Sequence, residues 1–438
     1  MKIKHVLLSA GLTGFYTDDK LAILKDAPQD GFVYKGKPLT PGFRQIRQPG
    51  ESVLVMLVMD TGEVALGDCA GTQYSGSGGR EPPFAHSTAI PLIEEHIVPR
   101  LIGREITSFT SASREIDEIE VNGVRLHPAI RYGVSQALLE SVALKRRITK
   151  AGVVADEYGT TVSEKPIPLY AQTGDERYTN VDKMIVKRIA IIPHGLINNV
   201  RDKVGSNGEK FLEYVTWVRK RVKEIGDSDY VPELHFDTYG TIGYAFNNDI
   251  GKVADYLVRC AEAAAPFQFI IEMPIDLGSK AAQLEGMDKL NRLLKTKGAK
   301  VDLMIDEWCN SFDDLKEWID SKSIQRINVK TITLGGLHNI VDAILYCNRN
   351  GVGAMVGGTC NETDISAMAM ANLAMATRPQ SIAGRPGMGV DEGVMTVYNE
   401  MVRVAMLEKL RSGATRQPPL AWQLEPSSTK GDRHETPG

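Results

Sequence analysis

The first part of the chain combines strand-like and helix-like patterns of apolar positions. Ser52–Met59 reads SVLVMLVM, a run rich in Val and Leu, and the turn DTG at 60–62 separates it from a second short run, EVALGDC. Two such runs around a turn predict a β-hairpin. Apolar residues with helical spacing follow over Ser87–Ile102 and Pro128–Thr149. The pattern therefore predicts an α+β domain over residues 1–158.

Further along the chain the pattern changes to short apolar runs that end in a polar or charged residue. These runs are RIAIIPHG, PELHFDTYG, PFQFIIEMP, AKVDLMIDEW, QRINVKT and GVGAMVGGT. Helical patterns separate them, near Glu209–Ile225, Asp249–Ala265, Ser279–Lys295, Phe312–Ser321, Gly336–Asn348 and Thr363–Ala376, and a last one covers Glu392–Leu410. Strands that are apolar on both faces and alternate with helices predict a parallel sheet. The number of units, and the absence of GxGxxG after the first strand, favour a (β/α) barrel over an open sheet.

We place this barrel at residues 159–412 and expect the N-terminal domain to pack over it as a cap. Residues 413–438 include QPPL and EPSSTKGDRHETPG and are polar and Pro-rich. That composition cannot bury enough apolar surface to order itself, so it indicates a loosely attached tail.

Composition narrows the class of protein. Apolar residues make up 42% of the chain and charged residues 24%, with a net charge of −4. These values are typical of a soluble globular protein and give no reason to expect nucleic acid or a membrane surface as a partner. No run of about 18 apolar residues is present to span a membrane. The five cysteines are widely spaced without a CxxC motif, and the N-terminus lacks a signal-peptide pattern, so we expect a reducing, cytoplasmic location.

A polar or charged residue stands at the end of five successive predicted strands: His194, Asp237, Glu272, Asp306 and Lys330. In a (β/α) barrel the carboxyl ends of all strands meet at one end, where active sites lie, and we call that end the barrel mouth. Three carboxylates in a closed mouth repel one another, and leaving them unpaired is costly. Mg²⁺ prefers oxygen ligands and resolves the repulsion. Asp237, Glu272 and Asp306 are therefore candidate Mg²⁺ ligands.

Lys330 and His194 are candidate bases. A nearby divalent cation and partial desolvation lower the pKa of a lysine and free its amine for proton abstraction. Singly, an acidic residue at a strand end more often caps the next helix, and a lone histidine is more often structural. The combination of three carboxylates with Lys330 in successive units reverses that preference. The Gly-rich segment YSGSGGR at 74–80 lacks GK[ST]; it is interpreted as a loop over the mouth, with a solvated turn as the alternative.

The Asp/Glu/Asp then Lys arrangement resembles the enolase superfamily. Within it, the chain resembles the methylaspartate ammonia-lyase family. The matching segments are CAGTQYSGSGGR (69–80), AQTGDERYTNVDKMI (171–185), IIPHGLINNV (191–200), HFDTYG (235–240), IEMPID (271–276), IDEW (305–308), VKTITLGG (329–336), GGTCNETD (357–364) and RPGMGVDEG (385–393).

The resemblance implies an enolase-superfamily TIM-like barrel with an N-terminal α+β cap and a Mg²⁺-dependent elimination of ammonia. L-threo-3-methylaspartate would lose its C3 proton to Lys330, pass through a metal-stabilised aci-carboxylate, and give mesaconate. His194 would serve the C3 epimer. The implied substrate contacts are Gln73, Gln172, Asn328, Thr359 and Cys360. The resemblance also implies a homodimer and leaves room for K⁺ as an activator.

Two positions depart from the family pattern. Asn328 stands where the family has Gln, which bears on the range of C3 substituents, and Tyr170 stands where Phe is frequent. Two alternatives remain at this point. One is another proton-abstracting enzyme of the superfamily, such as an acid-sugar dehydratase or a racemase. The other is a non-catalytic barrel that binds metal and carboxylates.

Overall fold

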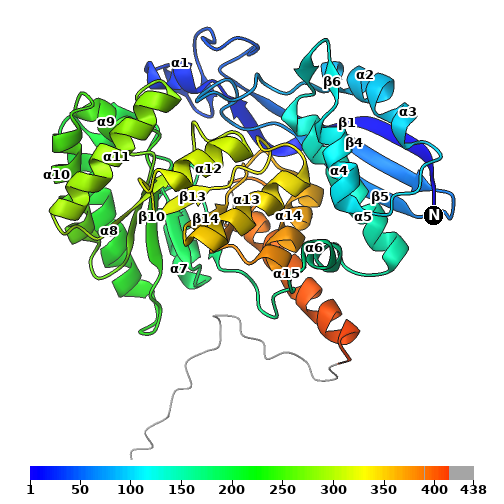
Figure 1. Ribbon diagram of the computed structural model, residues 1–438. Coiled ribbons are helices and arrows are strands. Elements are labelled where there is room, and N and C mark those ends of the chain that lie inside the picture. The colour runs from blue at the N-terminus through cyan, green and yellow to red at the C-terminus, as the bar shows by residue number, and fades with distance from the viewer. Residues whose placement is uncertain (389, 414–438) are drawn as a thin grey trace, which may run out of the picture.

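The computed structural model describes residues 1–388 and 390–413 (Figure 1). Residues 414–438 of the tail predicted at 413–438 lie outside the described residues. The N-terminal part is built on an antiparallel sheet of order β1-β4-β5, formed by Ile3–Asp18, Arg47–Met59 and Val64–Ala70. The predicted hairpin is β4–β5 and is confirmed. Side chains of β4 alternate between buried and less buried along Ser52–Met59, as expected for a strand with one face on a core.

Helices α2 (His86–His96), α3 (Val98–Leu101) and α5 (Pro128–Arg146) pack against this sheet, and α4 (Phe109–Asp117) and α6 (Lys150–Tyr158) pack against α5. The single helix predicted over Ser87–Ile102 is wrong, because the chain breaks between α2 and α3 at Ile97. Pro99 lies in the first turn of α3 and has no N–H to donate to the preceding turn, which explains the break.

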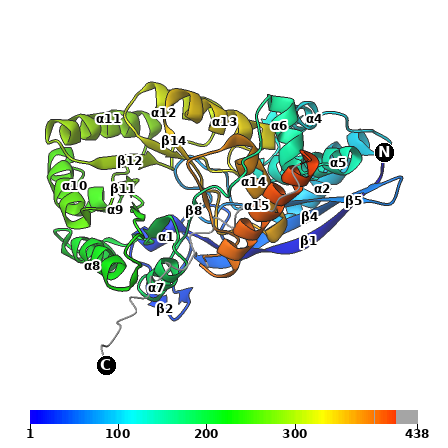
Figure 2. The same cartoon turned by 90° about the horizontal axis from the view of Figure 1, so that it is seen from below.

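Shorter elements complete the N-terminal part: α1 (Lys20–Leu24), β2 (Gln29–Asp30), β3 (Val33–Tyr34), β6 (Glu120–Val121) and β7 (Val124–Arg125). In Figures 1 and 2, α1 lies beside the barrel rather than beside the helices that pack on the β1-β4-β5 sheet. A small apolar cluster explains this placement, since Ile23, Ile46 and Tyr74 pack with Leu196 and Tyr239 of the barrel. The N-terminal part therefore reaches over the barrel as a cap.

The predicted barrel is confirmed as a closed ring of order β10-β11-β12-β13-β14-β15-β8-β9, in which every pair of neighbours is parallel. Its strands are β8 (Leu169–Tyr170), β9 (Ile191–His194), β10 (Glu233–Asp237), β11 (Phe269–Glu272), β12 (Val301–Ile305), β13 (Arg326–Asn328), β14 (Gly353–Val356) and β15 (Ser381–Ala383). The sequence pattern predicts six of these strands but not β8 and β15, because runs of two and three residues show no periodicity.

Helices alternate with the strands around the ring. They are α7 (Thr179–Val186), the π-helix η1 (Val200–Val204), α8 (Glu209–Ile225), α9 (Thr241–Ala245), α10 (Ile250–Ala264), α11 (Lys280–Thr296), α12 (Phe312–Asp320), α13 (Leu337–Asn350), α14 (Asp364–Thr377) and α15 (Glu392–Arg411). Among the described residues, no helix combines the length and the apolar character needed to cross a membrane.

The inside of the barrel is filled by side chains and is not a channel. Tyr170, Ile191, Ile270, Met304 and Met355 are buried there and form their own apolar cluster. This apolar cluster supports the strand ends, so the polar side chains that follow the strands are held at the barrel mouth.

Candidate active site

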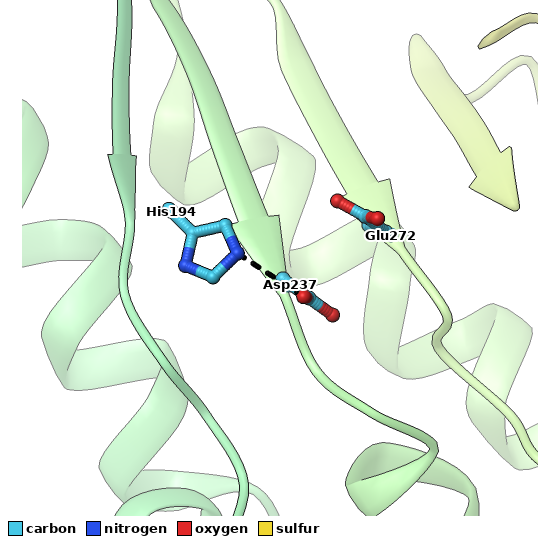
Figure 3. Close-up of side chains that lie close together, drawn as sticks. All are labelled: His194, Asp237 and Glu272. Atoms are coloured by element: carbon cyan, nitrogen blue, oxygen red, sulfur yellow. Dashed lines mark ion pairs between the residues drawn. The ribbon is translucent and has the colours of Figure 1, made fainter. Parts of the chain in front are cut away.

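Three of the predicted residues lie at consecutive strand ends with their side chains close together (Figure 3). His194 ends β9, Asp237 ends β10 and Glu272 ends β11, and one ligand atom from each lies within 4.8 Å of the others. His194 Nε2 lies 3.1 Å from Asp237 Oδ2. All three side chains are buried. The geometry thus gathers donors of the kind that hold a metal ion.

Asp306 and Lys330 follow β12 and β13 and meet each other at the same mouth. Lys330 Nζ lies 2.8 Å from Asp306 Oδ2, and Arg80 Nη2 lies 2.9 Å from Asp306 Oδ1. Every predicted site residue except Glu272 lines one pocket at this mouth. The sequence prediction that these strand ends converge is therefore confirmed for position, whereas the role of each residue stays a prediction.

Glu272 lies below the pocket and is contacted by two side chains. Asn328 Nδ2 donates to Glu272 Oε1 at 2.9 Å, so the residue that departs from the family pattern contacts a predicted metal ligand. His235 Nε2 lies 2.8 Å from Glu272 Oε2 but without hydrogen-bond geometry, and Oε2 is a buried oxygen with no hydrogen-bond partner. An unpartnered buried carboxylate oxygen is costly, and a cation would satisfy it.

The pKa values at the site reflect this crowding of buried acids. Burial raises the pKa of Asp237. Burial, with the charges of Asp237 and Asp306, raises the pKa of Glu272 well above its usual range. Burial, helped by His194, lowers the pKa of His235 well below its usual range, so this imidazole is neutral at neutral pH. The pattern is that of a carboxylate cluster that lacks sufficient positive charge from the protein alone.

Cations from the cap supply part of that charge, and the sequence pattern did not predict them. Lys20 Nζ lies 3.1 Å from Glu307 Oε1, and Arg80 Nη1 lies 3.6 Å from the same oxygen. Burial opposes ionisation of Glu307, but Lys20, Arg80 and Lys330 outweigh it and lower its pKa to about 2. Glu307 directly follows Asp306 in the IDEW motif, so the sequence contained a signal that Glu307 belongs to the site. The sequence around Lys20 contained no such signal.

The Gly-rich segment at 74–80 lies over the barrel mouth, as the sequence analysis expected. The carbonyl of Gly78 accepts hydrogen bonds from Trp308 N at 3.2 Å and from Asn310 Nδ2 at 2.8 Å. Gly78 has φ +60°, and a Cβ there would lie 2.7 Å from the side chain of Glu307, so glycine is required for this close approach. The segment holds Arg80 against Asp306.

The two candidate bases lie on opposite sides of the pocket. His194 ends β9 and Lys330 follows β13, and these strands are four places apart in the closed ring of eight. A molecule bound between them presents one face to Lys330 and the other to His194. The chain turns into the left-handed region at His194 (φ 67°), and in the following loop Leu196 packs against the cap residues Ile23 and Tyr74.

The predicted substrate contacts line the same pocket, and three of them are joined by hydrogen bonds. Gln73 reaches it from the cap, where its Oε1 accepts from Cys360 Sγ at 3.1 Å and its backbone N–H donates to Thr359 Oγ1 at 3.2 Å. Burial raises the pKa of the Cys360 thiol to about 12, so it is a neutral donor rather than a nucleophile. Gln172 and Asn328 line the pocket as well.

The residues at the mouth fit a hard divalent cation. Asp237, Glu272 and Asp306 supply carboxylate oxygens from three neighbouring strands, and two of these oxygens, Glu272 Oε2 and Asp306 Oδ1, are buried without a hydrogen bond. Oxygen-only donor sets favour Mg²⁺ over softer metals. In the described structure, Lys330 and Arg80 offset the charge of Asp306.

The fold and site define a class of protein: a (β/α) barrel with an N-terminal cap, the fold of the enolase superfamily. L-Ala-D/L-Glu epimerase from Bacillus subtilis shares this fold at a TM-score of 0.61 and 16% identity, over 90% of this chain and 91% of its own. The chain belongs to the methylaspartate ammonia-lyase family, because the models of that family's N-terminus and C-terminus match residues 1–159 and 161–410.

Individual relatives agree with this assignment. Methylaspartate ammonia-lyase from Clostridium tetanomorphum is 51% identical over 93% of this chain and 99% of its own. The structure of that organism's β-methylaspartase as a Mg complex has a TM-score of 0.87 at 51% identity, over 94% of this chain and 100% of its own. The Citrobacter amalonaticus enzyme containing (2S,3S)-3-methylaspartic acid has a TM-score of 0.91 at 45% identity, over 93% and 100%.

Proposed function

We propose that this protein is a Mg²⁺-dependent carbon–nitrogen lyase that eliminates ammonia from L-threo-3-methylaspartate and forms mesaconate. The observation that carries the proposal is the pocket in which the Lys330 amine lies 2.8 Å from Asp306, with His194 and Asp237 paired on the opposite side. Relatives that match nearly the whole chain carry the name of this activity, and one solved relative contains methylaspartic acid.

The charge of the site suits this substrate. Lys20 and Arg80 balance the charges of Asp306 and Glu307, and Lys330 is left to act as the base. Mg²⁺ held by Asp237, Glu272 and Asp306 would balance the two remaining carboxylates. The site would then be close to neutral and would not repel an amino-dicarboxylate, which carries a single negative charge at neutral pH.

The chain's own residues carry out the proton transfer. Lys330 Nζ takes the proton from C3, the electron pair of the C3–H bond forms the C2=C3 double bond, and the C2–N bond breaks to release ammonia. Mg²⁺, when bound, supplies electrostatic stabilisation of the charge that develops on the substrate carboxylate next to C3. His194, on the opposite side of the pocket, would take the proton from the C3 epimer.

The substrate is oriented by side chains around the pocket. We assign Gln73, Gln172, Thr359 and Cys360 to its carboxylate and amino groups, because their polar atoms line the same pocket as Lys330. Asn328 is assigned to the neighbourhood of C3, where its shorter side chain leaves more room than the Gln of the family pattern. We further propose a cytoplasmic homodimer, and K⁺ as an activating ion.

Ammonia release and the ultraviolet absorbance of mesaconate test the proposal, with a panel of 3-substituted aspartates as substrates. Lys330→Ala is expected to lower kcat for L-threo-3-methylaspartate by about 10²- to 10⁴-fold, the contribution that a general base makes. Lys280→Ala is the matched control, because Lys280 pairs with Asp314 and Glu317 outside the pocket. Chelation of Mg²⁺ is expected to stop turnover, and adding it back to restore it.

Two outcomes contradict the proposal. If the wild-type protein with Mg²⁺ binds methylaspartate but releases no ammonia, the alternative of a binding barrel is correct. If Lys330→Ala retains turnover within a factor of about two of Lys280→Ala, the base assignment is wrong.

A further inference from the structure

The amide of Gln73 is held at both ends by buried partners. Its Nε2 donates to Asp18 Oδ2 at 3.2 Å, and its Oε1 accepts from Cys360 Sγ at 3.1 Å. The main chain is fixed as well, since Asp18 N donates to the carbonyl of Gln73 at 2.9 Å. Cys360 lines the pocket with Gln73, whereas Asp18 lies behind it, outside the lining. Gln73 is therefore held from a second layer of the cap.

Asp18 is in turn held by Arg47. Arg47 Nε donates to Asp18 Oδ1 and Nη2 donates to Oδ2, each at 2.8 Å, and both side chains are buried. The guanidinium carbon lies 4.3 Å from the ring centroid of Phe32 and 5.0 Å from that of Tyr34. Two parallel hydrogen bonds and two aromatic faces fix the guanidinium plane, and that plane fixes the carboxylate.

These partners admit only one orientation of the Gln73 amide. A carboxylate accepts hydrogen bonds and cannot donate, so it requires the NH₂ end of the amide. Burial raises the pKa of Asp18, and the two bonds from Arg47 oppose that shift and favour the carboxylate. The Cys360 thiol is a neutral S–H group and donates to the carbonyl end. Turning the amide over would place two acceptors together at Asp18 and lose the bond from Cys360.

We propose that Asp18 and Arg47 form a positioning pair that sets the orientation of the Gln73 amide toward the substrate. This inference rests on the proposed function. One N–H of the Gln73 amide donates to Asp18, and one lone pair of its oxygen accepts from Cys360. The amide keeps its second N–H and its second lone pair for a ligand. The free N–H suits a substrate carboxylate and the free lone pair suits the substrate ammonium. The pair thus acts on an amino-dicarboxylate through Gln73 without contacting it.

Asp18→Asn tests the proposal, because an Asn side chain presents either a donor or an acceptor and no longer specifies the amide. KM for L-threo-3-methylaspartate is expected to rise about five- to tenfold, the effect of about one hydrogen bond, with a smaller change in kcat. Asp117→Asn is the matched control, since Asp117 forms a buried pair with Arg131 elsewhere in the cap. Its KM is expected to remain at the wild-type value.

A double-mutant cycle separates positioning from a general structural effect. In a Gln73→Ala background, Asp18→Asn is expected to change KM by less than about twofold, because the residue through which Asp18 acts is gone. An equal rise in KM in both backgrounds would overturn the proposal, as would an unchanged KM for Asp18→Asn alone. Arg47→Lys keeps the charge but not the two parallel bonds, so it provides a second variant if Asp18→Asn does not fold.

A crystal structure of Asp18→Asn with Mg²⁺ decides the inference independently of turnover. The Gln73 side chain is expected to leave its position or to spread over two. If it keeps the wild-type contact with Cys360 and shows no second position, the inference is wrong even where the enzyme is active. If the wild-type protein releases no ammonia, the proposed function fails, and this structure still reports on the positioning pair.

Discussion

Arg385 and Glu362 form an ion pair inside the protein whose disruption has a calculable cost. Arg385 Nη1 lies 2.8 Å from Glu362 Oε1, and the two side chains are 1% and 0% exposed. Glu362 also accepts hydrogen bonds from Tyr132 at 3.1 Å and from Thr331, the neighbour of Lys330, at 2.9 Å. Arg385→Met removes the cation and leaves the carboxylate with two hydroxyl donors. Breaking a buried pair from one side costs about 3–5 kcal/mol of unfolding free energy.

Urea unfolding followed by circular dichroism measures this cost. Arg403→Met is the control, since Arg403 is 61% exposed and its pair with Glu400 is expected to contribute less than about 1 kcal/mol. Adding Glu362→Gln to Arg385→Met is expected to recover part of the loss, because a neutral amide needs no cation. A loss below about 1 kcal/mol for Arg385→Met would refute the reasoning.

Two further predictions concern the cap and its junction with the barrel. His338 donates to or accepts from Ser113 Oγ at 2.8 Å, and burial lowers its pKa to about 4. The fold favours the neutral imidazole, so its contribution to stability is complete above about pH 6.5 and is lost as the pH falls toward 4. Unfolding free energies at pH 7 and pH 4.5 should therefore differ more for the wild type than for His338→Gln, and equal differences would exclude the effect. Gly67→Ala is expected to destabilise the cap by more than about 2 kcal/mol, because a Cβ would lie 2.2 Å from Gly133 O; a melting temperature equal to that of the wild type would contradict this packing.

The barrel was predictable because its strands carry an unmistakable pattern. Runs such as FQFIIE and VDLMID are apolar on both faces and end in a carboxylate, and regular spacing with helices between them leaves few other folds. The first strand of the cap, Ile3–Asp18, was not delimited in advance. Its edge position leaves many side chains partly exposed, so its alternation is weak.

The candidate site was predictable where a residue stands at a strand end and unpredictable where it reaches across domains. Asp237 and Glu272 end their strands, and strand ends converge in every barrel. Lys20, Arg80 and Asp18 act through tertiary contacts between the cap and the mouth, and no spacing in the sequence specifies such contacts. Arg80 had one hint, the glycines before it, whose left-handed φ values permit the close approach of the loop.

The contacts between cap and mouth argue that the barrel alone cannot hold a working site. Glu307 is fully buried, and two of the cations that lower its pKa, Lys20 and Arg80, belong to the cap. Removing the cap would expose the pocket to water, leave Asp306 with Lys330 as its one ion-pair partner among the described residues, and remove Gln73. Charge balance, exclusion of water and substrate orientation are therefore shared between the two parts of the chain, and substitutions in the cap should affect catalysis as directly as substitutions in the barrel.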